Sequence, residues 1–291
     1  MTATINKAEH RPMTSAEYHA HPALGASMLE TFRESRRKFY GQHVAQTMPP
    51  REPTDAMQLG TLVHLRLLEP ERFPEAVADP YPEVAPDGKN WLRRKGSDHE
   101  AWWQEEVNKR LGKIAAEKHT LDLVEAVVAA VKANDRANWL LSQQGESEFP
   151  IFWTDPDTGL PCKIMVDWFA AISLDLKTAY DPSPAAYAKS LVGLGYHRKL
   201  AHYKCGLSHY CGENAEFVHI AAGTTAPHCV ACYEVDDRDR QGFNLGAAQR
   251  RRMLYELAEC YRTNDWREPW EKSVVTLQLP AWAFQEDSYQ Y

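Results

Sequence analysis

The sequence lacks any long apolar segment. No run approaches the roughly 18–20 consecutive apolar residues that a membrane-spanning helix needs. The first residues, MTATINKAEHRPMT, also lack the apolar core of a secretory signal peptide. We therefore expect a cytoplasmic protein with no membrane partner.

An excess of positive charge is missing as well. The 33 lysines and arginines are outnumbered by 40 aspartates and glutamates, which gives a formal net charge of −7. This balance excludes a protein that binds nucleic acid through a uniformly basic surface, but it allows a local basic groove within an acidic surface. A hydrophobic content of 44% and a charged content of 25% are typical of a globular protein.

We do not expect the six cysteines to form a disulfide framework, because the sequence shows no export signal that would direct the chain to an oxidising compartment. The spacing of Cys229 and Cys232, preceded by Cys205 and Cys211, leaves zinc or an iron–sulfur cluster open as an alternative. However, HCVACYEV is typical of a strand, where residues three apart point to opposite faces. We expect reduced and mostly buried thiols.

With 291 residues, the chain can bury a large core. We expect an α/β (α+β) fold with a flexible N-terminus (1–17), a single domain (18–264) and a C-terminal tail (265–291). Residues 18–145 should be mainly helical and residues 146–264 should contain the sheet. The expected helices are 27–44, 54–69, 98–112, 119–143, 183–192, 196–210 and 237–262, and the expected strands are 146–154, 163–169, 172–178, 216–222 and 228–235.

The stretch KIMVDWFAAISLDLKT, residues 163–178, predicts a β-hairpin that carries three charged groups. A turn near Ala171 would place Asp167 opposite Asp175, with Cβ atoms roughly 4.5–5.5 Å apart. A divalent cation would offset the repulsion between the two carboxylates. Because side chains alternate along a strand, Asp175 and Lys177 would share one face. An exposed hairpin with an ordinary ion pair fits the same pattern.

Two other segments can bring ligands to this hairpin. In the helix expected at 54–69, Met57, Gly60, Val63 and His64 lie on one face, which directs the imidazole inward. Gly60 would let that helix approach another backbone closely. Glu148, on the strand before Asp167, either supplies a further carboxylate or is an exposed strand residue.

Two basic clusters are candidates for phosphate contact. Arg33, Arg36, Arg37 and Lys38 share the outer face of the helix expected at 27–44, which equally fits a solvated helix face. The second cluster ends the long 70–97 loop and combines basic residues with an aromatic, as single-strand binders do; it comprises Lys89, Trp91, Arg93, Arg94 and Lys95.

The order of four motifs makes the pattern specific. GTLVH, GLPCKIMVDW, LDLKT and GYHRKLAHYKCGL follow one another, and YHAHPALGASMLETF precedes them. This order resembles the RecE exonucleases (exodeoxyribonuclease VIII), a RecB-like branch of the PD-(D/E)xK nucleases, over most of residues 18–245. The resemblance implies a PD-(D/E)xK core with a central mixed β-sheet flanked by helices.

The resemblance also implies roles for individual residues. Mg²⁺, or Mn²⁺ as a substitute, would be bound by His64, Asp167, Asp175 and the Leu176 carbonyl, with Glu148 as a further candidate. Catalysis would use Asp167, Asp175 and Lys177. DNA contacts would come from Arg33, Arg36, Arg37, Thr178, Tyr196, Lys199 and Tyr203. Lys199 departs from the family, which usually has glutamine there, and a lysine cannot accept a hydrogen bond.

By resemblance, the substrate is a free end of double-stranded DNA, degraded 5′ to 3′ in phage-type recombination. A single-strand annealing protein is the implied partner, and ring-shaped relatives imply a homo-oligomer. Two alternatives stay open, namely a RecB-like or Cas4-like nuclease that acts on other DNA ends or structures, and a catalytically silent DNA-end-binding protein.

Overall fold

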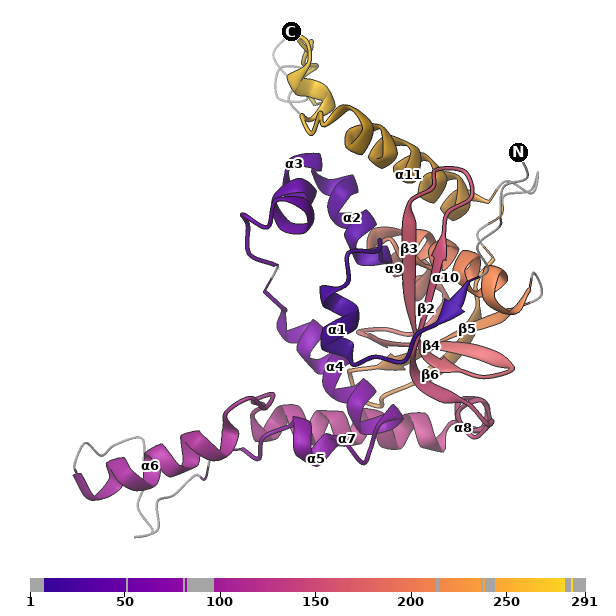
Figure 1. Cartoon of the computed structure of the whole chain (residues 1–291). Coiled ribbons are helices and arrows are strands. Elements are labelled where there is room, and N and C mark those ends of the chain that lie inside the picture. The colour runs from indigo at the N-terminus through magenta and orange to yellow at the C-terminus, as the bar shows by residue number, and fades with distance from the viewer. Residues whose placement is uncertain are drawn as a thin grey trace, which may run out of the picture.

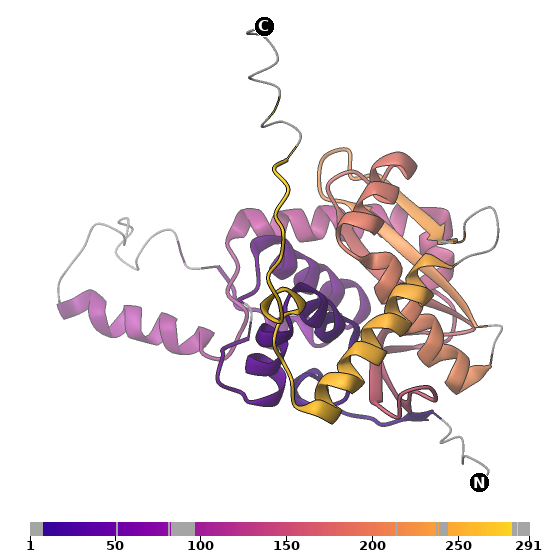
Figure 2. The ribbon, with the colours of Figure 1, turned by 90° about the horizontal axis from the view of Figure 1, so that it is seen from above.

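A computed structural model describes residues 8–50, 52–80, 82, 97–212, 215–236, 238, 244–280 and 284 (Figures 1 and 2). The basic cluster expected at 89–95 lies outside the described residues. Within the described part of the chain, none of the helices has both the length and the apolar character that a membrane span needs.

The centre of the fold is a mixed sheet of six strands in the order β1-β2-β3-β4-β5-β6 (Figure 1). Only β4 and β5 run parallel, and every other neighbouring pair is antiparallel. The prediction of a central mixed sheet flanked by helices is confirmed. The strands are β1 (Glu9–His10), β2 (Glu146–Thr154), β3 (Pro161–Phe169), β4 (Ile172–Ala179), β5 (Glu216–Gly223) and β6 (Val230–Glu234).

Helices cover both faces of the sheet, and each face has its own hydrophobic core. One core joins α4, α7 and α8 to β4 and β5 through residues such as Val63, Val127 and Leu176. The other joins α2, α10 and α11 to β2 and β3 through residues such as Phe32 and Ile164. The helical elements are α1 (Ser15–Ala20), α2 (Ala26–Glu34), α3 (Arg36–Phe39), the π-helix η1 (Tyr40–Val44), α4 (Asp55–Leu68), α5 (Phe73–Ala76), α6 (Ser97–Arg110), α7 (Lys118–Ala133), α8 (Asp135–Leu141), α9 (Pro184–Gly193), α10 (Tyr196–Cys211), α11 (Leu245–Thr263) and the 3₁₀ helix η3 (Pro269–Glu271).

Several predicted boundaries differ from the structure. The helix expected at 119–143 divides into α7 and α8, because the Asn134 side chain accepts the Ala137 N–H and caps a new helix. The segment expected to be flexible up to residue 17 contains β1, which pairs with β2, and the start of α1, which Thr14 and Glu17 cap reciprocally. The helix expected at 27–44 breaks at Ser35, whose side chain accepts the Lys38 N–H and so caps a new helix. The last long helix begins at Leu245 rather than near 237, because Asn244 is its N-cap.

All six cysteines are free thiols, as expected. Burial is mixed, because Cys162 and Cys260 are buried whereas Cys211 and Cys229 are exposed. Burial raises the pKa of the Cys162 thiol to about 12, so this side chain acts as a small apolar core residue.

A buried polar network fixes α10 and α11 against the sheet. The Nε2–H of His202 donates to the carbonyls of Leu24 and Lys163, at 3.1 and 3.2 Å. Its Nδ1 accepts from Nε of Arg250 at 3.1 Å, and Arg250 also donates to Asp155 at 2.9 Å. Burial and the nearby guanidinium lower the pKa of His202 to about 3, so the imidazole is neutral.

Candidate metal centre

The site forms where β3 and β4 stop pairing. Trp168 and Leu174 form their one cross-strand pair, which has the register predicted from a turn near Ala171, whereas the predicted pair of Asp167 with Asp175 is not part of the ladder. Beyond it, the Asp167 carboxylate rather than a backbone carbonyl accepts the Leu176 N–H, at 2.7 Å. The Leu176 carbonyl points from the same edge of β4 as the Leu176 N–H. It is therefore also available to side chains rather than to the β3 backbone.

Helix α4 brings His64 to this carbonyl. Thr54 caps the helix, and buried Leu62, Val63 and Leu65 fix its inner face against the sheet. The Nε2–H of His64 donates to the Leu176 carbonyl at 2.8 Å and lies 3.6 Å from Oδ2 of Asp167. The helical spacing in the sequence therefore predicted the inward direction of the His64 side chain correctly.

Two neighbours of His64 differ from expectation. Met57 was expected to face inward, but 49% of its surface is exposed, because it lies in the first turn of α4 beyond the edge of the core. A Cβ added to Gly60 would meet Oγ1 of Thr178 at 3.6 Å, which is an ordinary contact. Close packing therefore does not require glycine at position 60.

Glu148 completes the cluster from β2. The β2–β3 register continues on both sides of Glu148 and places it across from Asp167, although that pair is absent from the ladder. The backbone of Glu148 has a φ of 49°, a left-handed conformation that is uncommon for a non-glycine residue and typical of functional sites. The sequence left open whether Glu148 is exposed or near the metal site, and the structure places it in the cluster.

The donor atoms of His64, Glu148 and Asp167 all lie within 4.8 Å of one another. In the described part of the chain, this is the one group of three or more such side chains that close together. Burial and the Asp167 charge raise the pKa of Glu148 to about 7. Burial also raises the pKa of Asp167, although His64 opposes this effect. The crowded carboxylates therefore favour a positive charge between them.

The donor set fits a hard divalent cation. Carboxylate and carbonyl oxygens are the ligands that Mg²⁺ and Mn²⁺ prefer, and an imidazole is compatible with both. His64, Glu148, Asp167 and the Leu176 carbonyl would hold such an ion. The raised pKa values of the two acids agree with this assignment, because they indicate negative charge that no protein cation neutralises fully.

Asp175 and Lys177 lie beside this group. Nζ of Lys177 is 2.6 Å from Oδ2 of Asp175 and 3.3 Å from the Leu176 carbonyl. Burial alone would lower the pKa of Lys177, but the charges of Asp175 and Asp167 raise it. Burial alone would raise the pKa of Asp175, but Lys177 and His219 lower it. Lys177 is therefore a cation paired with Asp175, and the charge of Asp167 also favours its protonated form.

His219 on β5 is a neighbour that the sequence analysis missed. Its Nε2 lies 3.7 Å from Oδ2 of Asp175, and its Nδ1 lies 3.0 Å from the hydroxyl of Tyr187. Burial lowers the pKa of His219 to about 4. The alternating pattern of β5 could identify His219 as inward-facing, but not its neighbour across the sheet.

Helix α10 supplies further groups near Lys177. Nζ of Lys177 lies 5.9 Å from the ring centre of Tyr196, and Nζ of Lys199 lies 5.3 Å from the same ring. Burial and Lys177 lower the pKa of Lys199. Tyr203 packs against Phe217 at the core, so most of its ring surface contributes to packing.

The arginines proposed for DNA contact are all paired within the protein. Arg33 pairs with Glu30 at 3.0 Å, Arg36 with Glu256 at 2.8 Å and Arg37 with Glu271 at 2.8 Å. Arg36 also packs over the Phe32 ring and is only 16% exposed. Its geometry is that of a structural ion pair between α3 and α11, whereas Arg33 and Arg37 remain near the surface.

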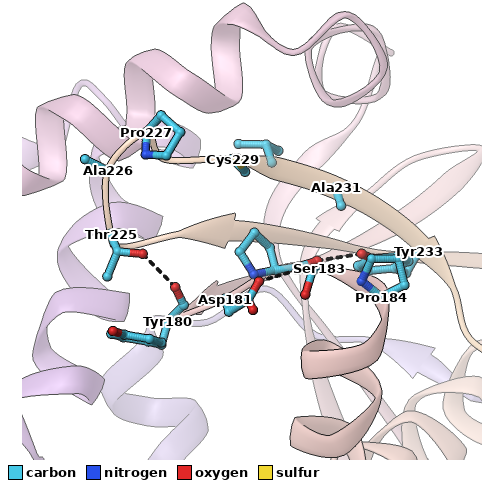
Figure 3. Close-up of a pocket in the computed structure, with 12 residues that line it drawn as sticks. Tyr180, Asp181, Ser183, Pro184, Thr225, Ala226, Pro227, Cys229, Ala231 and Tyr233 are labelled. Carbon is cyan, nitrogen blue, oxygen red and sulfur yellow. Dashed lines mark hydrogen bonds between the residues drawn. The ribbon is translucent and has the colours of Figure 1, made fainter.

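A surface cleft of about 390 Å³ lies just beyond the C-terminal end of β4 (Figure 3). Its walls come from the loop that precedes α9 and from the segment that joins β5 to β6. Hydrogen bonds brace these walls, because Thr225 donates to the Tyr180 carbonyl at 2.9 Å and Tyr233 donates to the Pro182 carbonyl at 2.5 Å (Figure 3). The sequence analysis did not anticipate this cleft.

The mixed sheet, the acids of β3 and β4 and the lysine two residues after Asp175 define a PD-(D/E)xK core. The sequence profile described as a PDDEXK-like domain of unknown function matches residues 25–273, and the chain belongs to this family. A comparison with curated proteins gives no significant match. Among solved structures, the chain is similar to a protein from Eubacterium rectale described as a "putative exonuclease", with a TM-score of 0.57 and 14% identity over 94% of this chain and 98% of that one.

Proposed function

We propose that this protein is a divalent-metal-dependent nuclease that degrades linear double-stranded DNA from an end. The observation that carries the proposal is the convergence of His64, Glu148, Asp167 and the Leu176 carbonyl on one point, with Lys177 beside it. Membership of the PDDEXK-like family and the fold shared with the E. rectale protein support it.

In this proposal, the chain provides a ligand set and one cation. The ion would be held by His64, Glu148, Asp167 and the Leu176 carbonyl. Asp175 is a further ligand, because it occupies the position of the second acid in the PD-(D/E)xK motif. When bound, Mg²⁺ lowers the pKa of a coordinated water and neutralises charge on the scissile phosphate. Lys177 is kept protonated by Asp175, so it orients the water and stabilises negative charge rather than removing a proton.

DNA contacts are assigned to α10 and the end of β4. The ammonium groups of Lys177 and Lys199 lie 5.9 and 5.3 Å from the Tyr196 ring centre, so two cations that suit a phosphate group gather here. Thr178 follows Lys177 on the same strand. We assign Arg33 and Arg37 a weaker role, because their carboxylate partners already neutralise them.

The resemblance to RecE exonucleases supports the finer assignments. These are 5′ to 3′ polarity, a role in phage-type recombination, a single-strand annealing partner and a homo-oligomer. They rest on motif order alone, whereas the metal site rests on geometry.

One gel tests the proposal. Linear, nicked and covalently closed duplexes of the same sequence are incubated with Mg²⁺ or with EDTA, and Lys177→Ala is run in parallel. We expect loss of the linear duplex only, only with Mg²⁺, and only for the parental protein. Rapid cutting of closed circles would indicate an endonuclease. DNA binding with no cleavage under any condition would indicate a silent end-binding protein.

A further inference from the structure

His219 lies in a row of side chains that crosses three strands. The parallel register of β4 and β5 pairs Asp175 with His219, and the antiparallel register of β5 and β6 pairs His219 with Tyr233. Paired residues of neighbouring strands project from the same face of a sheet. Asp175, His219 and Tyr233 therefore follow one another across that face.

The buried contacts of His219 favour one arrangement of its protons. Asp175, His219 and Tyr187 are all buried, with 5%, 2% and 2% of their surface exposed. A carboxylate only accepts, so the ring nitrogen that faces Asp175 carries the proton. The other nitrogen then accepts from the Tyr187 hydroxyl at 3.0 Å. The result is a chain of contacts from Tyr187 through His219 to Asp175, in which the Tyr187–His219 contact is a hydrogen bond and Nε2 of His219 lies 3.7 Å from Oδ2 of Asp175 as an electrostatic contact.

The outer end of this chain is anchored. The Tyr187 ring stacks on Tyr233 with centroids 5.1 Å apart and an interplanar angle of 16°. The Tyr233 hydroxyl donates to the Pro182 carbonyl in the wall of the cleft (Figure 3). Tyr187 therefore has little freedom to rotate, and it fixes the orientation of the His219 ring.

No other residue of β5 can replace His219 at this point. Phe217 and Ala221 are its neighbours on the same face of β5, and neither carries a polar side-chain group. On the other side, Asp175 is paired with Lys177 at 2.6 Å through the same oxygen that faces His219. Without His219, the ion pair with Lys177 alone would determine the orientation of the carboxylate.

We propose that His219, held by Tyr187, is a positioning residue that fixes the Asp175 carboxylate for metal binding. This inference rests on the proposed function, in which Asp175 is a metal ligand. Residues that orient a metal ligand typically contribute 10–100-fold to metal affinity. His219 should act in this way without touching the metal or the DNA.

Substitutions at His219 and Tyr187 separate positioning from simple core packing. The amide nitrogen of His219→Gln can occupy the place of Nε2 and keep the donor to Asp175, whereas His219→Asn can keep only the contact with Tyr187. Tyr187→Phe removes the hydroxyl and retains the ring stack on Tyr233. His197→Gln is the matched control, because this buried histidine bonds to Leu191 and Gln249 instead.

Mn²⁺ binding is measured by calorimetry without DNA, and the melting temperature is measured in EDTA. We expect His219→Asn to weaken Mn²⁺ binding about 10–100-fold. His219→Gln should stay within about threefold of the parental affinity, and Tyr187→Phe should fall between the two. The His197→Gln control should change only the melting temperature. Equal affinities for His219→Asn and the parent, or equal losses for Asn and Gln, would overturn the inference.

Asp175→Asn distinguishes this inference from the proposed function. If Asp175→Asn binds Mn²⁺ like the parent, Asp175 is no ligand and the proposed metal set itself fails. If Asp175→Asn loses affinity while every His219 variant keeps it, only the positioning role of His219 is wrong.

Discussion

Glu148→Gln should stabilise the fold much more in the absence of metal than in its presence. Burial and Asp167 raise the pKa of Glu148 from 4.5 to about 7. A carboxyl whose pKa is higher in the folded state destabilises the fold increasingly from pH 4.5 to about 7, and fully above that. Each pKa unit corresponds to about 1.4 kcal/mol, so at pH 8 the charge costs at most about 3.4 kcal/mol. The neutral amide removes this cost.

In EDTA at pH 8, the variant should therefore have a higher free energy of unfolding than the parent. This difference should shrink as the pH falls toward 4.5. With Mn²⁺ the advantage of the variant should shrink. At a concentration of about 100 times the parental Kd, the ion stabilises the parent by about 2.7 kcal/mol. A variant that binds 10–100-fold more weakly would gain only about 0.4–1.4 kcal/mol.

The assay is urea unfolding followed by circular dichroism, in EDTA and in Mn²⁺. Glu146→Gln is the control, because this glutamate lies on the same strand with 59% of its side chain exposed, and its change should stay within about 0.5 kcal/mol. If Glu148→Gln is no more stable than the parent in EDTA and gains as much from Mn²⁺, Glu148 is not part of the metal site.

Three further predictions concern cleavage, DNA affinity and pH. Lys177→Ala should reduce the cleavage rate by about 10²–10⁴ and leave calorimetric Mn²⁺ binding intact, because the ammonium acts on charge that develops during the reaction; a near-parental rate would contradict this. Lys199→Gln, which restores the residue usual in RecE relatives, should lower the slope of log affinity for DNA against log salt by about 0.9, the value of one phosphate contact; an unchanged slope would show that Lys199 contacts no phosphate. Since the pKa of His202 falls from 6.5 to about 3 on folding, the unfolded chain binds a proton that the folded chain does not, and stability should fall by up to about 1.4 kcal/mol per pH unit as the pH drops below 6.5. His202→Gln should flatten that slope in urea titrations at pH 7.5 and 5.5, and an unchanged slope would assign the pH dependence to another group.

Local sequence patterns were sufficient to predict part of the site. The turn near Ala171 determines the pairing of Trp168 with Leu174, and therefore the positions of Asp167 and Asp175. The helical spacing of α4 directs His64 toward the sheet. These features depend on residues within one helix or one hairpin, where periodicity and turn chemistry determine the geometry.

The remaining site residues depend on contacts between distant segments. Glu148 enters the cluster through the register of β2 and β3 and its unusual backbone conformation. His219 lies beside Asp175 only because β5 pairs in parallel with β4, after two helices intervene. The partners of Arg36 and Arg37 lie more than 200 residues away, on α11 and η3. No local pattern encodes such pairings.

The location of the bound ion tests the central claim most directly. Crystals grown with Mn²⁺ and a short blunt duplex would be measured at the manganese absorption edge, so that anomalous scattering locates the ion. We predict a peak bound by His64, Glu148, Asp167, Asp175 and the Leu176 carbonyl, with a DNA phosphate beside it and Lys177 within hydrogen-bond reach of that phosphate. A peak elsewhere, or an ion bound without Asp167 and His64, would contradict the proposed active site.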